Sequence, residues 1–180
     1  MRKLTVLAAT VAAFAGATAA SAQTAPLPAQ PYLGVTGGYH ELDGGDELGN
    51  YDISTGGAIF GVVGGVDFPL SEAVKVGVEG NFNVGTGRID NEYGVAGRLA
   101  FPLSETSQGY VRGGYQWVKL DVSDILPTPP ATLDTTGGDY LVGAGVEFGG
   151  ARLGGMSVRV GVDTLGFDTI RGTAGLIFKF

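Results

Sequence analysis

Residues 74–84 read Val74-Lys75-Val76-Gly77-Val78-Glu79-Gly80-Asn81-Phe82-Asn83-Val84, and their polarity alternates with a period of two. The even positions are apolar or Gly, whereas the odd positions carry Lys, Gly, Glu, Asn and Asn. Successive side chains of a β-strand point to opposite faces, so this period is typical of a strand with one apolar and one polar face. The rest of the chain shows no sustained helical period of 3.6.

The same alternation recurs along the chain and predicts eight strands. We expect them near residues 32–42, 57–68, 74–84, 92–101, 109–119, 139–148, 156–164 and 169–180. Their lengths are close to the roughly 9–11 residues with which a tilted strand crosses a bilayer. The 180-residue chain contains no Cys, so no disulfide can stabilise it. These observations predict an all-β fold, a closed antiparallel up-and-down eight-stranded transmembrane β-barrel.

A five-residue phrase, FPLSE, occurs at residues 68–72 and again at residues 101–105, 33 positions on. Pro cannot donate a hydrogen bond to a strand ladder and Ser suits turns, so each copy is expected to end a strand and open a tight turn. Phe148, before two glycines, and Phe180 are expected to end two further strands. A solenoid would repeat a motif in every unit, whereas here only the turn recurs.

The N-terminus has the features of an export signal. Arg2 and Lys3 precede the apolar residues 4–17, and Ala20-Ser21-Ala22 fits the small-residue pattern that a signal peptidase cleaves. We therefore expect residues 1–22 to be a cleaved signal peptide.

The mature chain is expected to contain a Pro-containing linker, residues 23–31, and the barrel, residues 32–180. Loss of Arg2 and Lys3 lowers the number of Lys and Arg from 11 to 9 against 18 Asp and Glu, which gives a net charge of −9. This charge disfavours nucleic acid as a partner.

The aromatic residues on the apolar face decide which face meets the membrane. Assigned by parity, they form two rings, separated by about 8 to 10 residues or roughly 25 Å of tilted strand, near the height of a bilayer's apolar band. This predicts an interfacial girdle with the apolar face outward. The predicted girdle consists of Tyr39, Phe68, Phe82, Tyr93, Phe101, Trp117, Tyr140, Phe148 and Phe180.

The opposite face carries charges that are too costly for lipid. Arg or Lys in mid-bilayer costs about 2–4 kcal/mol each, so these residues are expected to face the lumen and to pair there. The predicted lumen ion-pair network consists of Asp67, Lys75, Glu79, Arg98, Arg112, Glu147, Arg159, Asp163, Arg171 and Lys179. Inward glycines make room for these long side chains, and a wide aqueous pore is not expected.

Residues 32–180 resemble the small eight-stranded outer-membrane barrels of Gram-negative bacteria, of the OmpA, OmpX and opacity-protein type. The most specific element is the last strand, residues 170–180, which alternates and ends on Phe. By this resemblance, Phe178 and Phe180 act as the signal for the barrel-assembly machinery. The resemblance further implies a place in the bacterial outer membrane, contact with its lipid and lipopolysaccharide, and no enzymatic activity.

In that family, external loops carry recognition of a host or envelope surface, as in adhesins. The corresponding loops here are residues 43–55, 85–91, 121–138 and 164–168. The sequence does not choose between adhesion, host-surface contact and envelope integrity.

Three other functions are kept as alternatives. One is a narrow porin-like channel through the lumen, and another is a soluble barrel of lipocalin type with its apolar face inside. The third is a lipid A-modifying enzyme that uses His40, the only histidine, with Asp43 and Ser54 as nearby candidates. No cofactor is expected, and no metal, because the acidic residues 43–52 lack the spacing of a calcium loop.

Overall fold

The structure, a computed structural model, describes residues 28–42, 56–120, 136–150 and 154–180. Eight strands run through these residues, in chain order. They are β1 (Gln30–Glu41), β2 (Gly56–Pro69), β3 (Lys75–Gly85), β4 (Ile89–Ser104), β5 (Ser107–Leu120), β6 (Thr136–Gly150), β7 (Met156–Leu165) and β8 (Thr169–Lys179). All eight strands predicted from the alternation are present. Among the described residues, no helix is long and apolar enough to cross a membrane.

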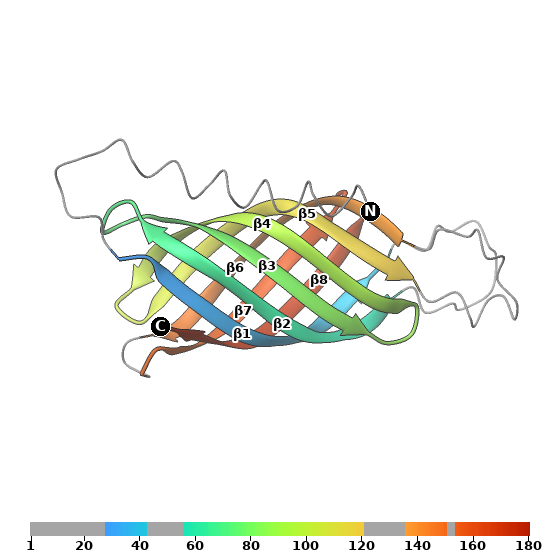
Figure 1. The fold of residues 1–180 in the computed structure, drawn as a ribbon, viewed down its shortest axis with the longest axis horizontal. Coiled ribbons are helices and arrows are strands. Elements are labelled where there is room, and N and C mark those ends of the chain that lie inside the picture. Colours follow the sequence, from blue (N-terminus) through green and yellow to red (C-terminus); the bar gives the residue numbers. More distant parts are fainter. Residues whose placement is uncertain (1–27, 43–55, 121–135, 151–153) are drawn as a thin grey trace, which may run out of the picture.

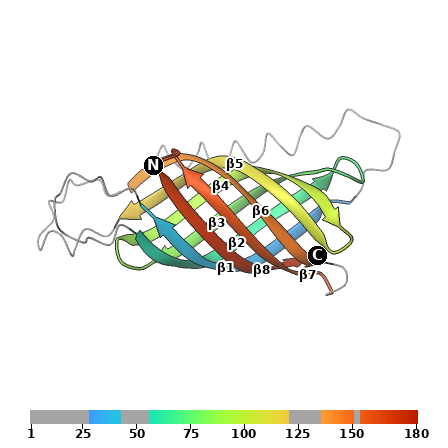
Figure 2. The ribbon, with the colours of Figure 1, turned by 180° about the vertical axis from the view of Figure 1, so that it is seen from behind.

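Each strand pairs antiparallel with the next, and β1 pairs with β8, which closes the sheet into a barrel. The closing pair runs from Tyr32 opposite Lys179 to Glu41 opposite Ile170. Figure 1 shows β1 to β5 wrapping the near wall with the strands inclined to the barrel axis, and Figure 2 shows β6 to β8 on the far wall. The predicted closed, antiparallel, up-and-down eight-stranded barrel is confirmed.

The two ends of the barrel differ, and we name each by one residue. At the Phe180 end, β2 and β3 are joined by residues 70–74, and β4 and β5 by residues 105–106. The His40 end has the connection of residues 42–55 between β1 and β2 and that of residues 121–135 between β5 and β6. Residues 43–55 and 121–135, which make up most of two predicted loops, lie outside the described residues.

The two copies of the FPLSE segment differ in secondary structure. The first ends β2 at Pro69, and the amides of Leu70 and Ser71 donate to the carbonyl of Val74 at 2.9 and 3.2 Å, as a tight turn requires. The second lies mostly inside β4, which continues to Ser104, so the prediction that it ends a strand at residue 101 is wrong. The sheet accommodates Pro102 because the register shifts between Pro102 and Ser104, as in a β-bulge, where no amide donor is needed.

Two predicted loops at the His40 end are shorter in the structure. The connection between β3 and β4 is only residues 86–88, with Gly87 at φ 66°, rather than residues 85–91. Between β7 and β8 the connection is residues 166–168, where Gly166 and Phe167 both have positive φ. The amide of Asp168 donates to the carbonyl of Leu165 at 3.1 Å, which is the geometry of a tight hairpin turn.

The barrel is apolar outside and largely polar inside. Large hydrophobic side chains such as Phe60 and Val162 are more than half exposed, at 58% and 56%, on its outer wall. Inside, charged side chains such as Glu147 and Arg171 are each 1% exposed. Two small apolar clusters, one around Ile59 and one around Tyr32, also face inward. A water-soluble barrel would have the opposite polarity.

Glycines on the inner wall leave room for the buried charged groups. A Cβ added to Gly143 would collide with the carboxylate of Asp163, and one added to Gly145 or Gly161 would collide with the hydroxyl of Tyr110. On the outer wall the space is open, since a Cβ on Gly80 would meet only a carbonyl oxygen at 3.7 Å.

Replacing Gly143 by Val is therefore expected to lower the free energy of unfolding by about 1–3 kcal/mol, the usual effect of overpacking. Gly80→Val, the matched control on the outer wall, should change it by less than about 0.5 kcal/mol. Urea unfolding in lipid vesicles measures both. Equal effects of the two substitutions would show that the inner wall is not tightly filled at Gly143.

Candidate functional site

The centre of the lumen is built around one carboxylate, that of Glu79 on β3, which is 3% exposed. Its two oxygens pair with Arg112 on β5 and Arg159 on β7, and Arg98 on β4 lies 3.5 Å away. The hydroxyl of Tyr32 on β1 donates to it at 2.7 Å. Side chains from β1, β3, β4, β5 and β7 therefore meet at Glu79.

The network continues from Glu79 toward the Phe180 end through Glu147. The Nη2 atoms of Arg98 and Arg159 each lie 2.7 Å from Oε1 of Glu147, and Nε of Arg159 donates to the same oxygen at 2.9 Å. The other oxygen accepts from Lys179 and from Gln108, both at 2.6 Å.

Toward the His40 end, the network continues through Asp163 and Glu92. Arg112 donates to both oxygens of Asp163, at 2.8 and 2.6 Å, and Arg171 donates to Oδ2 at 3.1 and 3.0 Å. Arg171 also donates to Oε1 of Glu92 at 2.6 Å, and Nδ1 of His40 lies 2.7 Å from Oε2 of the same carboxylate. Contacts thus run without a break from Lys179 at one end of the lumen to His40 at the other.

Two tyrosine rings hold the guanidinium groups at the centre. Arg98 lies 5.3 Å from the ring centre of Tyr32 and 4.7 Å from that of Tyr110, and Arg159 lies 5.2 and 5.1 Å from the same rings. Cation–π contacts of this kind stabilise cations that have been removed from water. A cavity lined by Thr36, Arg112, Arg159 and Arg171 among others measures 20 Å³, room for about one water molecule.

All ten residues expected in the lumen lie on the inner wall of the barrel. Nine of them form ion pairs with one another, among them Asp67, whose carboxylate lies 3.5 Å from Nε of Arg98. Lys75 is the exception, because among the described residues its ammonium group donates only to the amide oxygen of Gln30, at 2.9 Å.

Several members of the network are not among the residues predicted from the sequence. Glu92 shares the inward parity of Arg98, so alternation could have assigned it to the lumen, but the expected strand began at that residue. Tyr32 and Tyr110 are buried on the inner wall, whereas all the aromatic residues of the predicted girdle lie on the outer wall. Only the structure identifies them, because parity does not show which side chains meet a guanidinium group.

His40 is fully buried, with both ring nitrogens in contact with other groups. Besides Glu92 at Nδ1, the hydroxyl of Thr169 lies 3.3 Å from Nε2. Asp43 and Ser54, the candidates suggested by the sequence, lie outside the described residues. In the described part of the chain, no group of three or more His, Asp or Glu side chains is placed to hold a metal ion.

The predicted girdle residues all lie on the outer wall, in two groups. At the Phe180 end these are Phe68, Phe101, Phe148 and Phe180, and at the His40 end Tyr39, Phe82, Tyr93, Trp117 and Tyr140. Trp117 is partly covered because it stacks on Tyr93, with ring centres 5.4 Å apart. Tyr115, absent from the prediction, joins the second group through edge contacts with Trp117 at 4.8 Å and Tyr140 at 5.6 Å.

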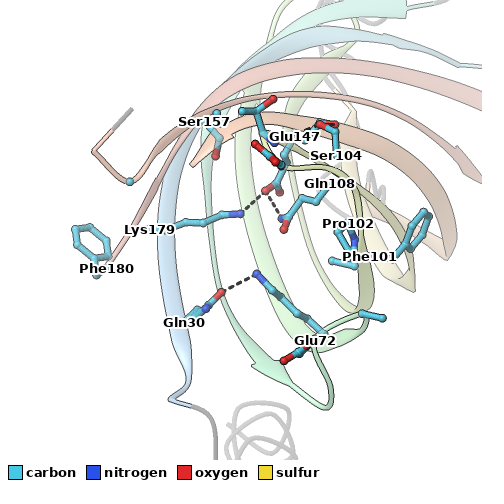
Figure 3. Close-up of a pocket in the computed structure, with 18 residues that line it drawn as sticks. Gln30, Glu72, Phe101, Pro102, Ser104, Gln108, Glu147, Ser157, Lys179 and Phe180 are labelled. Carbon is cyan, nitrogen blue, oxygen red and sulfur yellow. Dashed lines mark hydrogen bonds and ion pairs between the residues drawn. The ribbon is translucent and has the colours of Figure 1, made fainter. Parts of the chain in front are cut away.

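The Phe180 end of the lumen opens into a vestibule of 470 Å³. Figure 3 shows Gln30, Gln108, Glu147 and Lys179 projecting into it from the inner wall, with Glu72 at its edge.

The barrel is closed and has eight strands, and its outer wall is apolar while its interior is largely polar. These two features define the small transmembrane β-barrels as the class of protein. No protein-family model matches the chain, and no curated protein matches it in sequence. The similarity appears only at the level of solved structures.

Three such structures are similar along their whole length. Neisserial surface protein A has a TM-score of 0.55 at 11% identity, over 87% of this chain and 100% of its own. Ail, the attachment invasion locus protein of Yersinia pestis, has a TM-score of 0.52 at 15% identity, over 84% and 97%. A structure from the de novo design of transmembrane β-barrels has a TM-score of 0.51 at 15% identity, over 87% and 100%. The expected resemblance to small outer-membrane barrels is confirmed as a resemblance of fold.

Proposed function

We propose that this chain is an exported protein of the bacterial outer membrane whose barrel is a rigid, closed support for external loops. The observation that carries the proposal is the inverted polarity of the barrel, with an apolar outer wall and a buried ion-pair network inside. An apolar outer wall is stable only in contact with lipid. A closed barrel suits this environment, because the backbone N–H and C=O groups of every strand are hydrogen-bonded to a neighbouring strand.

The two aromatic groups anchor the barrel at the two interfaces of the bilayer. Aromatic rings favour the boundary between the acyl chains and the headgroups, so one group lies at each boundary, in contact with lipid and lipopolysaccharide. The Phe180 end, with its short turns, faces the periplasm, and the His40 end faces outward. Phe178 on the last strand and Phe180 directly after it are both exposed, and they serve as the recognition signal for the assembly machinery.

The external connections carry the interaction with a host or envelope surface. In barrels of this class, function resides in loops held by a rigid scaffold. The names of two similar proteins, an attachment invasion locus protein and a surface protein, support a role of this kind. Here the two longest connections at that end are residues 42–55 and 121–135.

Adhesion of bacteria that produce the protein to cultured host cells tests this role. Replacing residues 43–55 or 121–135 by Gly-Ser segments should reduce adhesion while the amount of folded barrel stays unchanged. Substitution of Glu72, at the opposite end, is the matched control. Unchanged adhesion in both loop variants would contradict a loop-borne function.

The network also predicts that the lumen does not conduct ions. Side chains that pair across the centre, among them Glu79 and Arg159, fill the lumen there, and the cavity lined by Arg159 has room for about one water molecule. Planar-bilayer recordings of the purified protein should show no ohmic single-channel conductance. A steady conductance that grows in Arg98→Ala would support the alternative of a narrow channel.

The alternative of a lipid A-modifying enzyme rests on His40. Its contacts with Glu92 and Thr169 follow the order of an orienting carboxylate, a base and a hydroxyl. The imidazole is nevertheless fully buried and is one end of the ion-pair chain. Mass spectra of lipid A from cells producing the wild-type protein or His40→Ala should be identical, and a mass change that requires His40 would favour the enzyme.

A further inference from the structure

The inner wall of the barrel holds charged groups of both signs. The inner wall buries five carboxylates, those of Asp67, Glu79, Glu92, Glu147 and Asp163. It holds six permanent cations, those of Arg98, Arg112, Arg159, Arg171, Lys75 and Lys179. The cations of the inner wall outnumber its buried carboxylates by one, and its two lysines lie at the Phe180 end, where the exposed carboxylates of Glu72 and Glu105 also line the vestibule.

Lys75, the inner-wall cation for which the described residues provide no ion pair, lines the vestibule at the Phe180 end. Lys75 donates to Oε1 of Gln30 at 2.9 Å and forms no ion pair with the described residues. An ammonium group has three N–H donors, so two remain for other partners. Lys179 lines the same vestibule, and its one carboxylate partner, Glu147, also serves Arg98 and Arg159.

A second donor at the vestibule lacks a partner. Ser157 is 2% exposed and lines the vestibule, yet its Oγ forms no hydrogen bond within the described part of the chain. Buried hydroxyl groups are nearly always hydrogen-bonded. The nearby carboxylate of Glu147 already accepts from Lys179 and Gln108 at 2.6 Å on one oxygen and from Arg159 at 2.9 Å on the other.

We propose that the vestibule binds a small oxyanion, a phosphate or a carboxylate, between the ammonium groups of Lys75 and Lys179 with Ser157 as an additional donor. A bound anion would accept from the N–H donors of Lys75 that Gln30 leaves unused and from the Ser157 hydroxyl. The exposed carboxylate of Glu72 at the rim disfavours extended polyanions, which restricts the site to small anions. A volume of 470 Å³ readily holds an anion of this size with its water.

Titration of the ¹⁵N-labelled barrel in detergent micelles with sodium phosphate, and separately with sodium acetate, tests the proposal. Ionic strength is held constant with sodium chloride. The amides of Ser157 and Lys179 should shift and saturate with at least one anion, whereas those near His40 should not move. The anion that saturates at the lower concentration identifies the ligand class.

Lys75→Gln should weaken the binding about tenfold or more, because a charge-assisted hydrogen bond is lost. Ser157→Ala should weaken it less and leaves all ion pairs intact. Lys119→Gln, on the outer wall at the opposite end, is the matched control and should bind as the wild type does. Shifts that never saturate with either anion, or equal affinity in wild type and Lys75→Gln, would overturn the proposal.

Discussion

Replacing Glu79 by Ala should lower the free energy of unfolding by about 3–5 kcal/mol, since breaking a buried ion pair leaves unpaired charge in a low-dielectric interior. Glu79 is the carboxylate that Arg98, Arg112 and Arg159 share at the centre of the lumen. Within the described part of the chain, its loss leaves these three cations with only the carboxylates of Asp67, Glu147 and Asp163 as partners. Urea unfolding in lipid vesicles, followed by the fluorescence of Trp117, the only tryptophan, measures the change.

The matched control for Glu79→Ala removes a carboxylate from an exposed ion pair. Asp90 lies 2.6 Å from Nζ of Lys119, and both side chains are nearly half exposed, at 44% and 47%. Exposed pairs contribute about 0–1 kcal/mol, so Asp90→Ala should have little effect. Similar changes for Glu79→Ala and Asp90→Ala would mean that the lumen is hydrated and that its ion pairs are not the core of the barrel.

Placing a charge on the outer wall should be nearly as damaging. Ala144 faces outward on β6, midway between Tyr140 and Phe148 of the two aromatic groups. If the outer wall meets lipid, this position lies near the bilayer midplane, where Arg costs about 2–4 kcal/mol. Ala144→Arg should therefore lower the free energy of unfolding by that amount in lipid vesicles.

Ala144→Leu controls for side-chain size, and it should leave the free energy of unfolding within about 0.5 kcal/mol of the wild type, as at most surface sites. A wall in contact with water would accept Arg and Leu equally well. The difference between the two variants therefore measures the lipid contact itself.

The strands could be predicted because the two faces of each strand meet different surroundings, so apolar and polar residues alternate along its sequence. Residues 74–84 illustrate this, since the polar positions of that run, with Glu79 at its centre, are those that the structure places inside. Boundaries were less predictable where the chain departs from regular pairing. Pro102 can remain in β4 only because of a bulge, and a bulge has no clear signature in the sequence.

The partners within the lumen could not be predicted. Parity assigns a residue to the inner wall but not to a height along the barrel axis, because height depends on strand tilt and register. Glu79 and Arg159 are 80 positions apart and lie on strands that are not neighbours in the sheet. Their contact follows from closure of the barrel, as does the approach of Tyr110 to the guanidinium groups of Arg98 and Arg159.

The central claim is that this chain forms a closed barrel embedded in the outer membrane, and gel mobility tests it most directly. The protein is collected in a purified outer-membrane fraction and run in SDS with and without boiling. We predict that it is found in that fraction and that its mobility shifts on boiling, because a closed, fully hydrogen-bonded barrel resists SDS until heated. Recovery in the soluble periplasmic fraction, with no shift on boiling, would contradict the account.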